Sequence, residues 1–397
     1  MGLIHNKVGP PVEGDDFFGR DRELVNAWED LNDGNHLLIS APRRIGKSSL
    51  VKRLVKDARD RGWKAAYIDV QGVTDELGFF KLFVETLKKE NEGWFSKMKG
   101  KTLESIDSLL SKIEFELKAG EGSVKFKWSG TQPVSILEQL GKLLEGTGDC
   151  LIAIDELPFF LARISNGEDG RQRLSDFLHW LRAYRQRDEK YLRWIFCGSI
   201  GLDTFTEKYR LSEAFNDVLV CDIGAFDEDT AKAFLVKLGH DNQLPLTEEN
   251  CCQILELIGW PLPFFLQAHF KQLKRLCGKG GFKAITGREV RQAYADIVDN
   301  TPPLRSWEER LDEQLKPEDS ACCKLLLTAI CRDKKGIRRK QLLDILYSRS
   351  PDPEQNEVRL SFCLKILERD GYLVCDTRCY SFRSPLLRDY WYKIKVK

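Results

Sequence analysis

The sequence predicts an α/β fold in which a parallel sheet carries helices on both faces, followed by an all-helical segment and a C-terminal segment of helices with a hairpin. Two observations predict this order. Short apolar runs, typical of buried strands, alternate with amphipathic helical patterns as far as residue 221. Beyond residue 224 the strand pattern stops, and a hairpin pattern returns only at residues 371–382.

The first half of the chain supplies the strands. A Gly- and Pro-rich arm over residues 1–16 leads into a helix at residues 21–31. The expected strands are residues 36–40, 64–70, 150–154, 192–197 and 217–221. Further helices are expected up to residue 60 and at residues 77–89, 134–144 and 170–187. Residues 95–132 mix two patterns and are interpreted as a helix followed by a small β element at 124–128.

The second half is predicted to form a helical lid and then a winged helix. The lid helices are expected at residues 229–238, 247–258, 262–276 and 287–297. The Pro-containing stretch 299–303 is a plausible boundary. Beyond it we expect helices at 307–315, 320–331, 339–346 and 357–370, the hairpin, and a last helical turn at 386–392. The predicted domains are therefore 1–224, 225–302 and 303–397.

The composition favours a folded protein of the cytoplasm. Hydrophobic residues make up 42% and charged residues 31%, and the net charge of +1 gives no chain-wide attraction for nucleic acid or anionic lipid. The 12 cysteines are scattered without CxxC spacing, which argues against a zinc site or a disulfide framework. No apolar stretch approaches the ~18 residues of a membrane span, so no membrane partner is expected.

A phosphate-binding loop is predicted between the strand at 36–40 and the following helix. Residues 41–48 fit the spacing GxxxxGK[ST], except that Ala41 replaces the first glycine. Backbone N–H groups of such a loop bind β- and γ-phosphates, Lys47 neutralises them, and the Ser48 hydroxyl ligates Mg²⁺. The expected nucleotide-binding residues are Ala41, Pro42, Arg43, Arg44, Ile45, Gly46, Lys47, Ser48 and Ser49. The alternative is a chance basic turn before a helix.

Two adjacent carboxylates end the apolar strand at 150–154. Packing does not require them there, so we expect Asp155 to hold Mg²⁺ through water, and Glu156 to orient and deprotonate the attacking water. The alternative is a pair of solvated acids at a strand end.

A third strand, at 192–197, ends in Gly198 and Ser199. We expect this strand to lie between the other two, so that Ser199 contacts the γ-phosphate or positions the water; a simple turn is the alternative. Arg210 is the first candidate for an arginine finger, ahead of Arg193 and the loop arginines. Each of these arginines is also compatible with an ordinary structural role.

The motifs taken together resemble the archaeal-type ATPase family, which belongs to the STAND branch of P-loop ATPases and is related to the AAA+ class. The resemblance rests on FGRDREL at 18–24, APRRIGKSS, LIAIDE, CGSIG and GWPL at 259–262. Residues 380–391 also resemble the end of that family's winged-helix domain.

The resemblance implies further site residues. It places Phe18, Gly19 and Arg20 beside the adenine or as an anchor of the first helix, and it places Pro261 where the lid meets the base. From the residues alone, Phe18 is more typical of a core position, and residues 259–263 of a helix-breaking turn.

The leading functional hypothesis is a molecular switch that binds ATP with Mg²⁺ and hydrolyses it to ADP and phosphate, slowly and under the control of a protein partner or effector. Nucleotide-dependent homo-oligomers are compatible with it. Two alternatives stay open. One is a nucleotide-stabilised scaffold that hardly hydrolyses ATP.

The other alternative is a DNA-binding ATPase of replication initiation or transposition, acting through residues 338–383. Its basic candidates are Arg338, Arg339, Lys340, Arg359, Lys365, Arg369, Arg378 and Arg383. Interspersed acids such as Glu357 and Glu368 dilute this basic surface.

Overall fold

The computed structural model describes residues 2–90, 108, 111, 148–186, 191–198, 212–280, 285–300, 302–348 and 352–397. The elements expected at 124–128 and 134–144 lie outside these residues, as does nearly all of the segment 95–132. The chain divides into two compact units. We call residues 20–41 and 47–223 the sheet unit, and residues 1–19, 42–46 and 224–397 the helical unit, and describe each by itself.

A five-stranded parallel sheet forms the centre of the sheet unit, which confirms the predicted fold class. The strand order is β2-β3-β4-β1-β5. The strands are β1 (His36–Ser40), β2 (Lys64–Asp69), β3 (Cys150–Asp155), β4 (Leu192–Gly198) and β5 (Val218–Val220). Every residue of β3 and β4 is buried, because helices cover both faces and a strand in that position must be apolar throughout. As predicted, β4 lies between β1 and β3.

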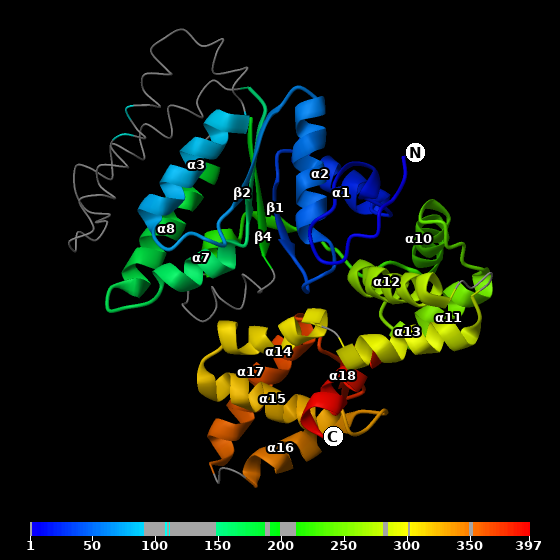
Figure 1. The fold of residues 1–397 in the computed structure, drawn as a ribbon. Coiled ribbons are helices and arrows are strands. Elements are labelled where there is room, and N and C mark those ends of the chain that lie inside the picture. Colours follow the sequence, from blue (N-terminus) through cyan, green and yellow to red (C-terminus); the bar gives the residue numbers. More distant parts are fainter. Residues whose placement is uncertain are drawn as a thin grey trace. The chain divides into compact units, whose positions relative to one another are not determined.

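Helices flank the sheet on both sides (Figure 1). They are α1 (Asp21–Asn32), α2 (Lys47–Asp60), α3 (Glu76–Glu90), α7 (Leu157–Ile164) and α8 (Gly170–Arg185). Figure 1 shows α1 and α2 on one side of the sheet and α3, α7 and α8 on the other. Phe79, Phe160 and Phe177 pack together with ring centroids 5.0–5.1 Å apart, and they bind the latter three helices to one another.

The helical unit contains two sets of helices and a small sheet. The first set is α10 (Glu228–Asp241), α11 (Glu248–Ile258), α12 (Pro263–Gly280) and α13 (Gly287–Asn300). The second set is α14 (Pro302–Gln314), α15 (Pro317–Ile330), α16 (Arg339–Tyr347), α17 (Pro353–Arg369) and α18 (Pro385–Lys395). The expected hairpin is β7 (Leu373–Asp376) with β8 (Cys379–Phe382), and the unpredicted strand β6 (Ile337–Arg338) pairs antiparallel with β8.

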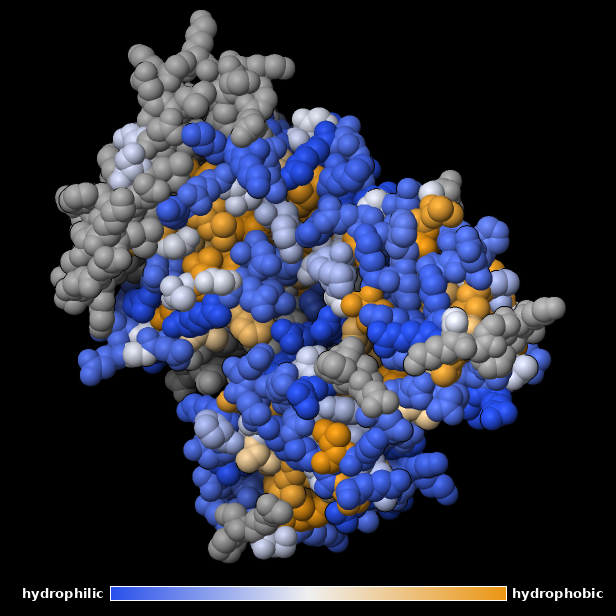
Figure 2. All heavy atoms as spheres, viewed as in Figure 1, coloured by the Kyte–Doolittle hydropathy of each residue, from blue (hydrophilic) through white to orange (hydrophobic). Residues whose placement is uncertain are grey.

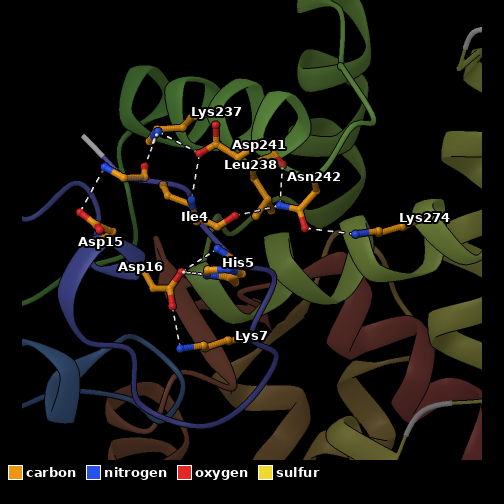
Figure 3. A network of polar contacts seen from close by, with 11 residues as sticks. Ile4, His5, Lys7, Asp15, Asp16, Lys237, Leu238, Asp241, Asn242 and Lys274 are labelled. Atoms are coloured by element: carbon orange, nitrogen blue, oxygen red, sulfur yellow. Dashed lines mark hydrogen bonds and ion pairs between the residues drawn. The ribbon is translucent and has the colours of Figure 1, made fainter.

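The N-terminal arm is anchored on α10 (Figure 3). Ile4 is buried, its backbone N–H donates to Asp241 at 2.9 Å, and its carbonyl accepts from Asn242 at 2.9 Å. Further along the arm, the carboxylate of Asp16 accepts the backbone N–H of His5 at 2.6 Å. The extended arm is therefore an integral part of the helical unit, because side chains satisfy backbone groups that have no strand partner.

Replacing Gly259 by alanine is expected to lower the melting temperature. Gly259 ends α11 at φ 67°, and an added Cβ would lie 2.5 Å from Cδ of Pro385. The left-handed conformation alone costs an alanine roughly 1–2 kcal/mol, and the clash adds to this cost. Gly14→Ala in the same unit is the control, because Gly14 has φ 62° with no atom within 4 Å of its ideal Cβ. Equal melting temperatures of the two variants would contradict the clash.

On the face drawn in Figure 2, the surface of the described residues is largely polar. In the view of Figure 2, hydrophilic residues cover most of it and hydrophobic residues form separate patches. Among the described helices, none combines the length and the apolar character that a membrane span needs.

Candidate functional site

The predicted phosphate-binding loop joins β1 to α2. Gly46 has φ 104° and Arg44 has φ 66°, so two residues of the loop take left-handed backbone conformations before the helix begins at Lys47. Only glycine adopts this conformation without strain, and a non-glycine residue there is typical of functional loops. The N-terminus of α2 carries the positive end of the helix dipole, which makes this end suited to an anion.

The side chain of Lys47 turns back toward the start of the loop. Its ammonium donates to the carbonyl of Ala41 at 2.7 Å, and the residue is only 7% exposed. An ammonium group held against the loop in this way lies where a bound phosphate would be neutralised. Ala41 supplies the carbonyl that a glycine would supply, so the missing first glycine leaves this contact intact.

The two predicted carboxylates lie at the end of β3. Asp155 is 2% exposed, and its Oδ1 accepts the backbone N–H of Glu156 at 2.9 Å. Glu156 has φ 56°, a left-handed conformation that is strained for a glutamate, and it directly precedes α7. Strain of this kind is kept where a side chain must point in a set direction, which agrees with a reactive role for Glu156.

Cys197 shows that these groups lie together. Burial and a hydrogen bond with Asp155 raise the pKa of the Cys197 thiol, and the charge of Glu156 acts in the same direction. The charge of Lys47 acts in the opposite direction on that thiol. Cys197 lies in β4, which pairs with both β1 and β3. The carboxyl ends of three strands therefore bring one cation and two carboxylates around one buried thiol.

Sequence reasoning missed two neighbours of Asp155. Cys197 ends the strand expected at 192–197 and belongs to the CGSIG motif, but sequence reasoning gives its thiol no role. The other neighbour is Tyr67 of β2, whose hydroxyl donates to Asp155 Oδ2 at 2.6 Å. The available signal for Tyr67 is a tyrosine between the apolar residues at the centre of the strand.

Ser199 and Arg210 lie outside the described residues, so the predictions for them remain predictions. Arg193 is buried, and its guanidinium donates to the Leu31 carbonyl at 2.9 Å. That contact caps the end of α1 and gives Arg193 a structural role.

The residues that the family resemblance singled out lie in packed positions. The ring of Phe18 lies 5.5 Å from that of Phe234, and a Cβ on Gly19 would lie 2.5 Å from Thr230. Both contacts fix this segment to α10 within the helical unit. Arg20 is buried and pairs with Glu23 at 2.5 Å in the first turn of α1.

Pro261 lies in the turn between α11 and α12. Its carbonyl accepts the backbone N–H of Phe226 at 3.2 Å. The turn is the helix break that the sequence alone indicates. Contact of Pro261 or Phe18 with a nucleotide base stays a prediction.

The arginines of the loop, which belong to the helical unit, contact other segments of that unit. Arg44 donates to the Gly9 carbonyl at 2.9 Å, and its guanidinium lies 4.7 Å from the ring centroid of Phe264. Burial and the neighbouring charge of Arg43 lower the pKa of Arg44. Arg43 and Arg44 also line a small recess with Ser306, Trp307, Arg310, Asp370 and Tyr372.

Mg²⁺ prefers oxygen ligands, and the residues at this site supply them. Asp155 is the last residue of β3, and Ser48 follows Lys47 in the first turn of α2, at the same edge of the sheet. Mg²⁺ is commonly held by one or two protein oxygens together with water and substrate phosphates. The donor set therefore fits a magnesium–nucleotide complex.

Comparison with known proteins gives structural relatives only. No protein-family description and no curated protein sequence matches the chain. Among solved structures it is similar to the Walker-type ATPase PABY2304 of Pyrococcus abyssi, at a TM-score of 0.63 and 19% identity, over 97% of this chain and 99% of that one. The chain has the P-loop NTPase fold.

A second similar structure is the Aeropyrum pernix ORC2 protein, solved as ADPNP–ADP complexes. The TM-score is 0.57 at 13% identity, over 99% of this chain and 98% of that one. At such identities the likeness concerns the fold, and the chemistry has to be argued from the residues of this chain.

Proposed function

We propose that this protein is a switch that binds ATP with Mg²⁺ and hydrolyses it slowly to ADP and phosphate. The observation that carries the proposal is that Lys47, at the start of the helix after β1, and Asp155 and Glu156, at the end of β3, lie at the carboxyl ends of parallel strands that both pair with β4. Ligands of open α/β sheets bind at this edge. A buried cation beside two acids at the end of a phosphate-binding loop suits a nucleoside triphosphate with its metal.

Each residue has a distinct part in this proposal. Backbone N–H groups of the loop and the Lys47 ammonium bind the β- and γ-phosphates, while Ser48 and Asp155 hold Mg²⁺. The ion would neutralise charge that develops on the phosphates during transfer. Glu156 orients the attacking water and takes its proton, which its position next to Asp155 allows.

The loop arginines support a switch rather than a simple hydrolase. Arg44 belongs to the same loop as Lys47, and it contacts both the N-terminal arm and α12 of the helical unit. A phosphate that reorders the loop therefore changes contacts made by these segments. Differential contacts of this kind are what a ligand needs to shift a conformational equilibrium.

Saturating MgATP analogue is expected to change amide hydrogen exchange in α12, relative to the nucleotide-free protein. Arg44→Ala is expected to reduce this change, because the variant removes the guanidinium from Phe264 and leaves the loop backbone in place. Mass spectrometry of peptides from residues 261–280 measures the difference at saturating nucleotide, so that a modest loss of affinity does not matter.

Arg61→Ala is the matched control, because Arg61 places its guanidinium 3.9 Å from the Trp28 ring within the sheet unit. This variant is expected to keep the full exchange difference in α12. A wild-type protein that binds the analogue with no change in the exchange of α12 would contradict the switch.

The type of ATPase and the division into domains belong to the same proposal. We propose a STAND-like ATPase with a nucleotide-binding core at 1–224, a helical lid at 225–302 and a winged helix at 303–397. Helices α15, α16 and α17 with the β6-β8-β7 sheet support the winged helix. A protein partner or effector, and a nucleotide-dependent homo-oligomer, complete the proposed mode of action.

DNA binding through residues 338–383 stays a prediction. Several of its basic candidates are engaged by acids within the helical unit. Arg339 donates to Glu357 at 2.8 Å and to Ser361 at 2.7 Å, and Arg369 lies 3.4 Å from Asp370. Such pairs reduce the positive charge that a phosphate backbone would meet, so the structure gives DNA no preference over a protein partner.

A further inference from the structure

The buried carboxylate of Asp155 has a defined partner on each oxygen. Oδ1 accepts the backbone N–H of Glu156 at 2.9 Å, and Oδ2 accepts the Tyr67 hydroxyl at 2.6 Å. A carboxylate that is 2% exposed needs such donors, because its charge is poorly hydrated. Two oxygens offer about four lone-pair positions, so these bonds leave room for further ligands. The two bonds fix the plane of the carboxylate without occupying all of its lone-pair positions.

Two elements of the sheet unit hold Tyr67 in place. It lies in β2, where Tyr67 is paired with Ala153 and Asp69 is paired with Asp155. Lys52, on the helix that begins with Lys47, has its ammonium 5.2 Å from the centroid of the Tyr67 ring. The ring is therefore positioned by the strand next to β3 and by the helix that follows the phosphate-binding loop.

The Tyr67 hydroxyl is the donor in this contact, with its O–H directed at Asp155 Oδ2 2.6 Å away. The hydrogen bond therefore joins a neutral donor to a charged acceptor, which is the stronger kind.

We propose that Tyr67 is a positioning residue that holds the carboxylate of Asp155 in the orientation in which it binds Mg²⁺ with the nucleotide. The inference rests on the proposed function, since Asp155 is there the metal ligand. Hydrogen-bonding partners of metal ligands fix the orientation of those ligands, and their loss typically weakens metal binding by about 10- to 100-fold. A purely structural tyrosine would stabilise the sheet unit and leave the effect of Mg²⁺ on nucleotide binding unchanged.

The test compares ADP affinity in Mg²⁺ with ADP affinity in EDTA by isothermal titration calorimetry. The ratio of the two affinities isolates the metal contribution, because the phosphate contacts of the loop are common to both conditions. Tyr67→Phe is expected to lower this ratio about 10-fold while the affinity in EDTA stays the same. Tyr191→Phe is the matched control: Tyr191 is 57% exposed in the same unit, and its ratio should equal that of the wild type.

Each outcome separates the inference from the proposed function. A wild-type protein that binds no ADP in either condition removes the proposed function and this inference with it. A wild type with a clear magnesium effect that Tyr67→Phe fully retains overturns the inference alone. A larger ratio in Tyr67→Phe also overturns it, because the hydroxyl would then compete with the metal.

Tyr67→His is a second variant that tests the same role if Tyr67→Phe does not fold. Tyr67→His retains an aromatic ring with an N–H donor, so it is expected to keep part of the magnesium effect. Asp155→Asn sets the lower limit of the ratio of ADP affinities in Mg²⁺ and in EDTA, because it removes the charge that the metal needs. A loss in Tyr67→His as complete as that in Asp155→Asn would overturn the role of the donor.

Discussion

Replacing Lys47 by alanine is expected to remove most of the affinity for ATP. The buried ammonium is held against the loop by the Ala41 carbonyl, where it would meet the β- and γ-phosphates. Truncating one member of a buried charge pair typically costs about 2–5 kcal/mol, so the affinity should fall roughly 30-fold at least. Calorimetry with MgATP on the full chain measures the loss.

Lys56→Ala is the matched control for this experiment. Lys56 lies on the same helix, α2, is exposed and pairs with Asp60 at 2.6 Å, so its removal changes the charge without touching the loop. It should bind MgATP as the wild type does. Unchanged affinity in Lys47→Ala would refute the assignment of the loop as the phosphate site.

Replacing Glu156 by glutamine is expected to stop ATP hydrolysis and to leave ATP binding in place. The amide keeps the size and reach of the side chain but cannot take a proton from water. General-base catalysis contributes about 10²–10⁴-fold, so phosphate release should fall by a factor in this range. A coupled assay of phosphate release, together with calorimetry on the same preparation, separates catalysis from binding.

Glu85→Gln provides the comparison, since Glu85 is a half-exposed glutamate of α3 in the same unit. It should release phosphate at the wild-type rate. Equally slow release by the wild type and by Glu156→Gln would show that the chain binds ATP without turning it over. The nucleotide-stabilised scaffold would then replace the ATPase in our proposal.

Local sequence patterns predicted the helices and strands well where the apolar residues follow a single period. The strand at 36–40 has the predicted bounds, and the strand at 150–154 extends by one residue to include Asp155. Helix α7 escaped prediction because Leu157–Ile164 is apolar nearly all round and shows no polar face. Strand β6 escaped because two residues are too few to show alternation, and only its pairing with β8 defines it.

The sequence by itself determined that a loop ending at Lys47 joins a strand to a helix and that two carboxylates end another strand, because each of these features depends on residues close together in the chain. The loop also differs from the usual pattern at Ala41 without losing its lysine contact, which depends on a backbone carbonyl rather than on a side chain. Residue spacing and hydrophobic period are local properties, so they can be recognised in the sequence without any knowledge of the fold.

Only the tertiary structure decided which groups act on these residues. Tyr67 and Asp155 are 88 positions apart and meet because β2 and β3 are neighbours in the sheet. Cys197 reaches the same carboxylate because β4 lies between β1 and β3. Hydrogen bonds act over about 3 Å, so the partners of a buried carboxylate are set by strand order, which the periodicity of a single strand does not encode.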